Sequence, residues 1–487
     1  MDLNNQTLAD IDPSVRTPSY DRSEVSAGIV HFGVGGFHRA HQAMYLNELM
    51  NQGKALDWGI VGMGVMPSDA RMRDVLRSSD GLYTLVVKSP DGSRDVRVIG
   101  SIVDYVYAPD DVEGAIERLA DPAIRIVSLT VTEGGYNVNP VTGEFDLENA
   151  GVAADLVDPA HPKTVFGLIS AGLRRRRERG IAPFTVMSCD NIQGNGEVAH
   201  KMFGTFATAL DAEFGAWVEQ NVPFPNSMVD RITPVTTDAD RADVVSTYGI
   251  DDAWPVVCED FVQWVLEDTF VSGRPPYEEV GVQVVDDVVP YELMKLRLLN
   301  ATHQGICYFG HLAGYRAVHD AARNPLFADF LLRYMVEEAQ PTLAPLPDVD
   351  LPAYQHKLID RYSNEYVADT IARLCADSSD RIPKWLIPVV RENLAAGRDV
   401  TLSAAIVASW KRYAEGVDER GEPIQVVDRL AEQVQAAARS QDPLDFLRQR
   451  DLFGDIVDDE RFTAPYLKAL TALHDSGAVA TLEMLAA

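Results

Sequence analysis

Three polar residues on one predicted helix have the types and spacing that alcohol oxidation requires. Lys295, Asn300 and His303 interrupt an apolar segment, residues 291–308, that has the 3.6-residue period of an α-helix. At about 100° per residue, Lys295 lies about 80° from His303 and about 140° from Asn300 around the helix axis. All three side chains can therefore border one cleft. The expected buried stripe of this helix consists of Leu293, Leu296 and Leu299.

Oxidation of an alcohol needs a base for the hydroxyl proton and donors that stabilise the developing alkoxide. A lysine removed from water becomes a competent base near neutral pH. We expect Lys295 to be that base, Asn300 to donate to the alkoxide and His303 to orient a neighbouring hydroxyl. Asn191 directly follows a predicted strand, at the sheet edge where ligands bind in such folds. Glu292 lies one turn before Lys295 and could relay the proton to solvent. The alternative is that this helix face is solvated, in which case Glu292 forms only a surface ion pair with Lys295.

A glycine-rich turn near the N-terminus predicts a dinucleotide site. Gly33, Gly35 and Gly36 stand between a predicted strand and a predicted helix, which provides backbone N–H groups and a helix N-terminus without obstructing side chains. Arg39 occupies the place six after Gly33, where the dinucleotide-binding pattern has a third glycine, and an ordinary tight turn is the alternative. The residues expected to bind the cofactor here are Phe32, Gly33, Val34, Gly35, Gly36, Phe37, His38 and Arg39.

An acidic residue after the second predicted strand favours NAD over NADP. Asp69 can accept hydrogen bonds from the adenosine ribose, and its charge would repel a 2′-phosphate. Its distance from Gly33 is longer than the usual spacing of about 20 residues. Arg71 and Arg73 lie nearby and would suit a 2′-phosphate, so NADP is the alternative.

The predicted elements indicate an α/β domain followed by a mostly helical one. The 487 residues exceed the usual limit for a single core, which is roughly 250–300 residues. We assign residues 1–286 to a Rossmann-type NAD-binding domain with a parallel-rich sheet, and residues 287–487 to a helical substrate-binding and catalytic domain. The predicted strands are residues 28–32, 58–65, 82–88, 125–132 and 182–188. The predicted helices are residues 37–50, 109–120, 164–179, 291–308, 325–338, 353–374, 383–396, 401–414 and 424–440.

Charge and cysteine usage exclude several partners and ligands. The net charge of −30 repels phosphate backbones and anionic lipid, so we expect a small-molecule substrate and neither nucleic acid nor membrane as a partner. The cysteines are far apart, and His31, His38 and His41 fall on different predicted elements, so no metal is expected. The absence of a signal-peptide pattern and of a long apolar run leads us to expect a cytoplasmic protein, either a monomer or a weak homo-oligomer.

Three segments resemble the polyol-specific long-chain dehydrogenase family. They are HFGVGGFHRAHQAMYLNEL at residues 31–49, CDN at residues 189–191 and KLRLLNATHQGICYFGHLAGYR at residues 295–316. The Lys-x4-Asn-x2-His arrangement is that family's hallmark, and the resemblance runs from about residue 28 to about residue 440. It implies a two-domain, zinc-independent enzyme with its active site between the domains, which oxidises a polyol with NAD.

The resemblance also implies a role for each candidate residue. Lys295 is implied to be the base and His303 a substrate ligand. The oxyanion hole is implied to consist of Asn191 and Asn300. The remaining residues with implied roles are Glu292 in proton relay, Glu133 at the cofactor and, at the substrate, Asp230, Arg373 and either Arg381 or Lys384, where the family has a lysine.

Among the reactions of that family, we expect oxidation of D-mannitol to D-fructose, with hydride leaving C2. Oxidation of D-arabinitol or sorbitol at the same site is an alternative. A hexuronate reductase acting on fructuronate or mannonate is another, and its carboxylate substrate would require an additional cation. A catalytically silent NAD-binding sensor belongs to a different class and would be expected to lose the lysine or an asparagine, all of which this chain has.

Overall fold

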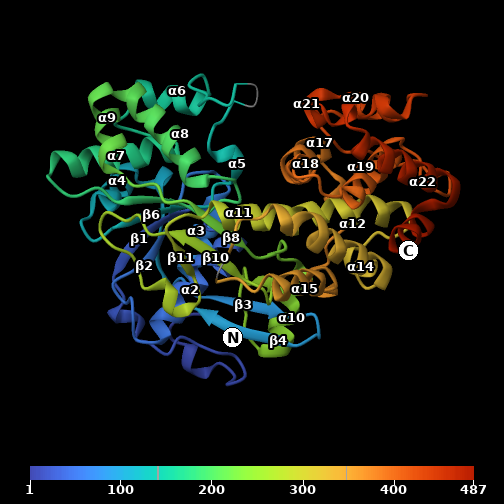
Figure 1. The fold of residues 1–487 in the computed structure, drawn as a ribbon. Helices are drawn as coiled ribbons and strands as arrows, with labels where there is room; N and C mark the ends of the chain where they lie inside the picture. The colour runs from blue at the N-terminus through green and yellow to red at the C-terminus, as the bar shows by residue number, and fades with distance from the viewer. Residues whose placement is uncertain (140–141, 347) are drawn as a thin grey trace. The chain divides into compact units, whose positions relative to one another are not determined.

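The computed structural model describes residues 1–139, 142–346 and 348–487 (Figure 1). The chain divides into two compact units, unit 1 from Met1 to Val288 and unit 2 from Val289 to Ala487. Unit 1 combines a parallel sheet with helices, whereas unit 2 is helical, which confirms the predicted fold class. No helix within the described ranges is both long and apolar enough to cross a membrane.

A five-stranded parallel sheet forms the centre of unit 1, with strand order β5-β2-β1-β6-β7. The strands are β1 (Ala27–Phe32), β2 (Gly59–Gly64), β5 (Ile102–Tyr107), β6 (Ile126–Leu129) and β7 (Thr185–Ser188). The chain extends the sheet first to one side of β1 and later to the other, so the topological switch point lies between β1 and β6, where Phe32 pairs with Leu129. Open α/β sheets bind ligands at the carboxyl ends of the strands at such a point.

Both faces of this sheet are apolar, which explains why it is covered on both sides. Ile29 of β1 belongs to one core cluster, and its neighbours Val30 and Phe32 belong to the other. The helices on the first face are α2 (Gln42–Asn51) and α3 (Asp69–Ser78). The helices on the second face are α4 (Val112–Ala120), α7 (Val165–Glu178), α8 (Asn195–Leu210) and α9 (Ala212–Asn221) (Figure 1).

Two three-stranded sheets complete the first face of unit 1. One has the order β4-β3-β9, with β3 (Tyr83–Lys88), β4 (Arg94–Ile99) and β9 (Val256–Glu259). The other has the order β11-β10-β8, with β8 (Ser227–Asp230), β10 (Gln263–Glu267) and β11 (Gln283–Val285). The remaining helices of unit 1 are α1 (Gly36–Ala40), α5 (Thr132–Gly135), α6 (Ala150–Val157) and α10 (Asp238–Tyr248).

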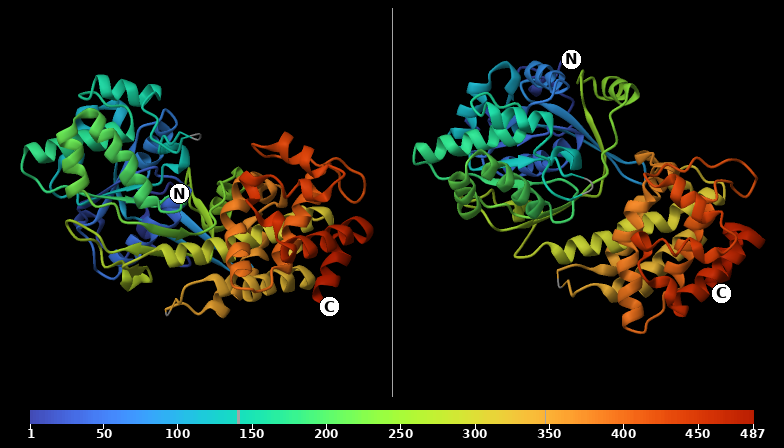
Figure 2. Two further views of the ribbon diagram at one scale, coloured as in Figure 1. Left: turned by 45° about the horizontal axis from the view of Figure 1, so that its top comes forward. Right: turned by 90° about the horizontal axis from the view of Figure 1, so that it is seen from above.

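Unit 2 is built around α12 (Ala301–Leu312), whose side chains are almost all buried. The first helices are α11 (Val289–Lys295), α13 (Val318–Ala322), α14 (Pro325–Arg333), α15 (Leu351–Tyr362), α16 (Ile371–Cys375) and α17 (Ser378–Trp385). They are followed by α18 (Ile387–Ala395), α19 (Thr401–Ala414), α20 (Ala431–Ala438), α21 (Arg450–Phe453) and α22 (Glu460–Ala486). Helix α12 packs against α13, α14, α16, α17, α19 and α22 (Figure 2). Two π-helical segments, η5 (Leu296–Asn300) and η6 (Tyr334–Ala339), continue α11 and α14.

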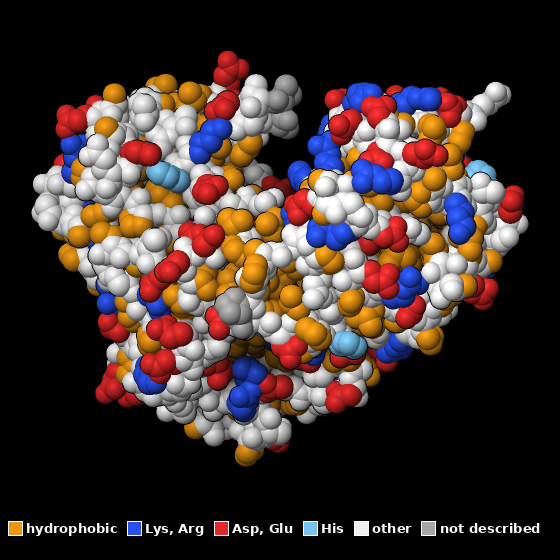
Figure 3. Space-filling model, in the orientation of Figure 1, with side chains coloured by type: hydrophobic (Ala, Val, Ile, Leu, Met, Phe, Trp, Pro, Cys, Tyr) orange, Lys and Arg blue, Asp and Glu red, His pale blue; other side chains and the backbone are white. Residues whose placement is uncertain are grey.

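The helix boundaries in unit 2 differ from the predicted ones at several places. Residues 401–414 form α19 as predicted. The predicted helix at residues 353–374 is confirmed only as far as Tyr362, where α15 ends, and the Asn364 side chain then accepts the Tyr366 N–H in a turn. Acidic side chains are spread over the visible face of both units and alternate with Lys and Arg, so the charge is not gathered in one patch on that face (Figure 3).

Candidate active site

The glycine turn joins β1 to α1 at the switch point of the central sheet. Gly33 has a φ of 90°, and an added Cβ there would overlap the carbonyl oxygen of Thr130, which follows β6, so glycine is required. The Thr130 hydroxyl donates to the Gly33 carbonyl at 2.7 Å and ties the two strand ends together. Gly35 is the N-cap of α1, and no side chain within the described residues caps this end. The first N–H groups of α1 are therefore available to an anion.

Helix α1 ends after five residues, which corrects the prediction of one continuous helix at residues 37–50. The chain breaks at His41, where φ is −122° and ψ is −91°. The carbonyl groups at the break have side-chain donors: the Tyr83 hydroxyl donates to Arg39 O, and Arg231 Nη1 donates to Ala40 O, each at 2.6 Å. Long-range hydrogen bonds thus replace the missing helical ones and fix the direction of α1.

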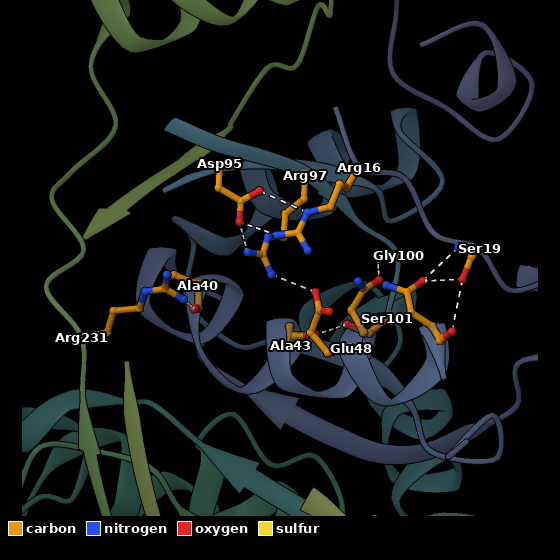
Figure 4. A network of polar contacts seen from close by, with 12 residues as sticks. Arg16, Ser19, Ala40, Ala43, Glu48, Asp95, Arg97, Gly100, Ser101 and Arg231 are labelled. Atoms are coloured by element: carbon orange, nitrogen blue, oxygen red, sulfur yellow. Dashed lines mark hydrogen bonds and ion pairs between the residues drawn. The ribbon is translucent and has the colours of Figure 1, made fainter. Parts of the chain in front are cut away.

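The helix that follows the break is held against the neighbouring sheet by a polar network (Figure 4). The Ser101 hydroxyl donates to Ala43 O at 2.7 Å, and Arg97 Nη1 donates to Glu48 at 2.9 Å. Asp95 accepts a hydrogen bond from Arg97 on the same strand. The two helices after the glycine turn are therefore anchored separately, α1 through Arg231 and α2 through this network.

Arg39 and His38, both expected near the cofactor, are buried inside unit 1. Arg39 is 1% exposed and donates from Nη1 to Trp254 O at 2.5 Å and from Nε to Gly35 O at 3.3 Å. This gives the residue in the third-glycine position a structural role in the turn. His38 stacks on His31 at 3.4 Å between ring centroids, and burial lowers the pKa of His31 to about 3, so that ring is neutral. In residues 1–139, 142–346 and 348–487, no group of three His, Cys, Asp or Glu side chains could hold a metal ion.

Asp69 lies at the carboxyl end of β2 as the first residue of α3. Its Oδ2 accepts the backbone N–H groups of Val65 and Met66 at 2.9 and 2.8 Å. These bonds fix the carboxylate, while Oδ1 has no hydrogen-bond partner in the described part of the chain. One oxygen is thus left for a ligand hydroxyl.

The two arginines that would suit a 2′-phosphate already have partners. The Arg71 guanidinium lies 4.4 Å from the centre of the Trp254 ring. Arg73 donates to Asp110 at 2.7 Å and to Asp74 at 2.8 Å. A phosphate would have to compete with two carboxylates for Arg73, and this arrangement favours NAD.

A buried carboxylate organises the ends of β6 and β7. Asp190 accepts the Thr132 N–H at 2.7 Å and the Tyr136 hydroxyl at 2.8 Å, and burial raises its pKa. Thr132, with a φ of 65°, begins the short helix that carries Glu133. Glu133 and Asn191 are both exposed at this edge. Asp190 therefore positions the backbone segments that carry Glu133 and Asn191.

The residues expected to transfer protons lie on one interrupted helix of unit 2. Lys295 ends α11 and is 7% exposed, and Glu292 is 6% exposed. Asn300 ends the π-helical segment η5, in which the Ala301 N–H donates to Leu296 O five residues earlier. Residues five apart lie above one another in such a turn. The separation of about 140° that α-helical geometry gives for Lys295 and Asn300 is therefore wrong, and both side chains lie nearer to one face.

The burial pattern of this helix also corrects the expected apolar stripe. Leu293 and Leu296 are half-buried, whereas Lys295 is buried. The fully buried positions include Met294 and Leu298. The π turn shifts the phase of the helix, so a stripe counted at constant α-helical spacing cannot hold across it.

Two hydroxyl groups contact the π turn. The Thr302 hydroxyl donates to Leu299 O at 2.9 Å, and the Tyr362 hydroxyl donates to the same oxygen at 2.9 Å. The Tyr362 ring lies 5.2 Å from the His303 ring, between centroids. The Oδ1 atom of Asn300 is buried and has no hydrogen-bond partner in the ranges that the structure describes.

The basic residues expected at the substrate lie around α16. Arg373 donates from Nε and Nη2 to both oxygens of Asp369, at 2.6 and 2.5 Å. Burial acts to raise the pKa of Asp369, but the bonds from Arg373 and the nearby His303 outweigh it, and the net shift is downward. Arg381 donates to Arg373 O at 3.2 Å, at the carboxyl end of α16, whereas Lys384 is exposed. Arg381, the first of the two alternatives, is thus the one that contacts the segment carrying Arg373.

Several supporting residues were not identified from the sequence. Asp190 stands between a predicted strand and Asn191, so its position at the sheet edge was a usable signal. Tyr362 lies 63 residues from Leu299, whose carbonyl group it binds, and no spacing rule connects the two. Asp369 lies four residues before Arg373, so the i,i+4 spacing of this ion pair was a usable signal. Asp230, which was expected at the substrate, is the last residue of β8 and is 7% exposed.

The two units match two family models. Residues 27–279 match the model described as the mannitol dehydrogenase Rossmann domain, and residues 287–474 match the mannitol dehydrogenase C-terminal domain. A mannitol 2-dehydrogenase of Phaeosphaeria nodorum is 43% identical over 488 residues, covering 99% of this chain and 85% of that protein. A mannitol 2-dehydrogenase of Neosartorya fischeri is 44% identical over 494 residues, covering 99% and 98%.

Two solved structures are similar along the whole chain. The Pseudomonas fluorescens mannitol 2-dehydrogenase in a ternary complex with NAD and D-mannitol is 46% identical, with 100% of this chain and 99% of that chain covered and a TM-score of 0.83. A D-sorbitol dehydrogenase in substrate-free form is 38% identical, with 99% and 100% covered and a TM-score of 0.95.

Proposed function

The chain belongs to the mannitol dehydrogenase family, and from that premise we propose that it oxidises D-mannitol to D-fructose with NAD, removing hydride from C2. The observation that carries this proposal is the buried Lys295 beside a π turn that ends in Asn300. The relative from Pseudomonas fluorescens, with NAD and D-mannitol in its complex, supports the choice of cofactor and polyol.

The residues at the carboxyl edge of the central sheet fit NAD. The turn Gly33–Gly36 and the uncapped first turn of α1 would hold the pyrophosphate through backbone N–H groups. Asp69, with Oδ2 fixed by two N–H donors, would accept the adenosine ribose hydroxyls on Oδ1. When bound there, NAD would supply the acceptor for the hydride. Glu133, exposed near the same edge, is proposed to contact the cofactor.

Lys295 takes the proton of the C2 hydroxyl in this proposal. Burial favours the uncharged amine, which is the form that acts as a base. Glu292, buried and three residues earlier on the same helix, passes the proton on. Asn191 and Asn300 donate to the alkoxide as charge develops on it.

The remaining polar residues bind the substrate in this proposal. His303 orients a hydroxyl next to the reacting one. Asp230, Arg373 and Arg381 recognise the rest of the polyol. Because Nε and Nη2 of Arg373 already bond to Asp369, the arrangement suits a neutral hydroxyl better than a second carboxylate. This disfavours mannonate as a substrate.

Sorbitol is the second candidate substrate. The structure of a D-sorbitol dehydrogenase, 38% identical to this chain, supports it. Sorbitol and mannitol differ in configuration at C2 and share that at C5, which is equivalent to C2 in the symmetric mannitol, so the same base and the same donors would serve sorbitol at C5. Discrimination would then depend on the residues that bind the non-reacting hydroxyls.

A substrate panel tests the proposal. D-Mannitol, sorbitol, D-arabinitol and mannonate are each supplied with NAD or with NADP, and reduced cofactor is followed by absorbance. We expect the highest kcat/KM with D-mannitol and NAD, and little turnover of mannonate. Preferential turnover of mannonate, or a preference for NADP, would contradict the assignment.

Location and assembly are also proposals. We propose a cytoplasmic enzyme, in keeping with four cysteines that are all buried and free of disulfides. A monomer or a weak homo-oligomer is expected. Light scattering across a concentration series, with and without NADH, measures the assembly state.

A further inference from the structure

The π turn η5 sets the angle around the helix axis between Lys295 and the two other site residues of this helix, Asn300 and His303. The Ala301 N–H bonds to Leu296 O, five residues back, instead of four as in an α-helix. A π turn is less favourable than continuous α-helix and is frequently found at functional sites. Its surroundings must therefore supply interactions that compensate for its cost.

Two hydroxyl groups provide such interactions at the end of the turn. The Thr302 hydroxyl reaches back to Leu298 O at 2.5 Å and to Leu299 O at 2.9 Å. The Tyr362 hydroxyl, on α15 and 63 residues away, donates to Leu299 O at 2.9 Å and lies 2.6 Å from the Thr302 hydroxyl. Both side chains are buried, so water does not compete for these carbonyl groups.

The same tyrosine contacts a second site residue. Its ring lies 5.2 Å from the His303 ring at an angle of 52°. The Oδ1 atom of Asn300, by contrast, has no hydrogen-bond partner among the described residues. The direction of the Asn300 amide is therefore set chiefly by the backbone of the π turn, which Tyr362 holds at the preceding residue, Leu299.

We propose that Tyr362 is a positioning residue of the polyol oxidation: its hydroxyl holds the π turn and its ring holds His303, so that Asn300 and His303 meet the hydroxyl that Lys295 deprotonates. Thr302 assists from within the helix. This inference rests on the proposed function. It assigns Tyr362 no contact with the reacting atoms.

Tyr362→Phe tests the inference because it removes only the hydroxyl. Outright removal of an oxyanion donor lowers kcat by about 10²–10³, and a displaced donor should cost less, so we expect kcat to fall about tenfold or more. NADH affinity, measured by fluorescence titration, should stay unchanged. The deuterium isotope effect on kcat with C2-deuterated mannitol should increase, because hydride transfer becomes slower relative to product release.

Matched variants separate positioning from a general loss of stability. Tyr334→Phe removes another buried hydroxyl of unit 2, one with no partner in the described part of the chain, and should leave kcat unchanged. Thr302→Ser keeps the hydroxyl and should retain activity, whereas Thr302→Val should reproduce the loss. If Tyr362→Phe does not fold, the comparison of Thr302→Ser with Thr302→Val tests whether hydroxyl groups hold the π turn for the reaction.

Hydrogen exchange in residues 296–303 gives a readout that does not depend on activity. We expect faster exchange there in Tyr362→Phe than in Tyr334→Phe. If the wild type is active and Tyr362→Phe changes neither kcat nor the exchange rate, the inference about Tyr362 is overturned while the proposed function stands. A wild type that oxidises no polyol would instead overturn the proposed function, and the exchange experiment would still show whether Tyr362 holds the turn.

Discussion

A buried carboxylate should make the stability of unit 2 fall as pH rises. Glu338 lies on η6, which packs against η5, and it is 1% exposed. It accepts the backbone N–H groups of Leu402 and Ser403 at 2.6 and 2.9 Å and also the Ser403 hydroxyl. Burial raises its pKa from 4.5 to about 7 and outweighs these donors.

The sign follows from proton binding. Between pH 4.5 and about 7 the folded protein holds the Glu338 proton while the unfolded chain has released it. The contribution to stability is therefore complete below pH 4.5 and is lost as pH rises through 7. A shift of this size, at about 1.4 kcal/mol per pH unit, corresponds to about 3 kcal/mol.

Glu338→Gln should remove this dependence because the amide does not titrate. The free energy of unfolding in urea, measured from pH 4.5 to 8 for both proteins, gives the difference between them. We expect the free energy of unfolding of the variant to increase by about 3 kcal/mol relative to that of the wild type as pH rises. Glu337→Gln, at the half-exposed neighbour, is the control and should follow the wild type. A difference that is constant with pH, or that favours the wild type more at high pH, would refute the reasoning.

Three further predictions concern the site residues. Lys295→Met should lower kcat by about 10²–10⁴, with NADH affinity in a fluorescence titration unchanged; a kcat near that of the wild type would eliminate Lys295 as the base. Asp69→Ala should reduce the preference for NAD over NADP, measured as a ratio of kcat/KM values, by about tenfold, since one hydrogen bond to a carboxylate is worth about 1.5–3 kcal/mol; an unchanged ratio would remove Asp69 from this role. Gly33→Ala should abolish NADH binding, because the new Cβ overlaps Thr130 O, whereas Gly53→Ala, with a φ of 72° and no neighbouring atoms, should only lower the melting temperature; equal NADH affinity in the two variants would contradict this.

The parts of the fold that local apolar patterns determine could be predicted from the sequence. Strand β1 and helix α19 agree with prediction to within a residue, because each is a continuous run of buried side chains. Strands β8 to β11 were not predicted, since they have three to five residues each and depend on partners far along the chain. Such short strands lack a period long enough to recognise.

The breaks within predicted helices could not be found by counting residues. The break at His41 has neither glycine nor proline at it, and it is stabilised by Tyr83 and Arg231, which lie 44 and 191 residues from the carbonyl groups they bind. The π turn after Lys295 has three leucines among its five residues, as a buried α-helix also would, so its composition does not reveal it. The identity of the candidate residues was visible in the sequence, but their relative angles were not.

The partner of Arg39 has a consequence for synthesis on the ribosome. The guanidinium is buried, yet the carbonyl group it binds belongs to Trp254, 215 residues later. While the N-terminal part of unit 1 emerges, Nη1 of Arg39 lacks this acceptor and only the longer bond from Nε to Gly35 O can form, and burying a cation that is short of acceptors is costly. The glycine turn can therefore reach its final form only after residue 254 has left the exit tunnel, and a nascent chain truncated before that point should expose the segment around Arg39 to proteases.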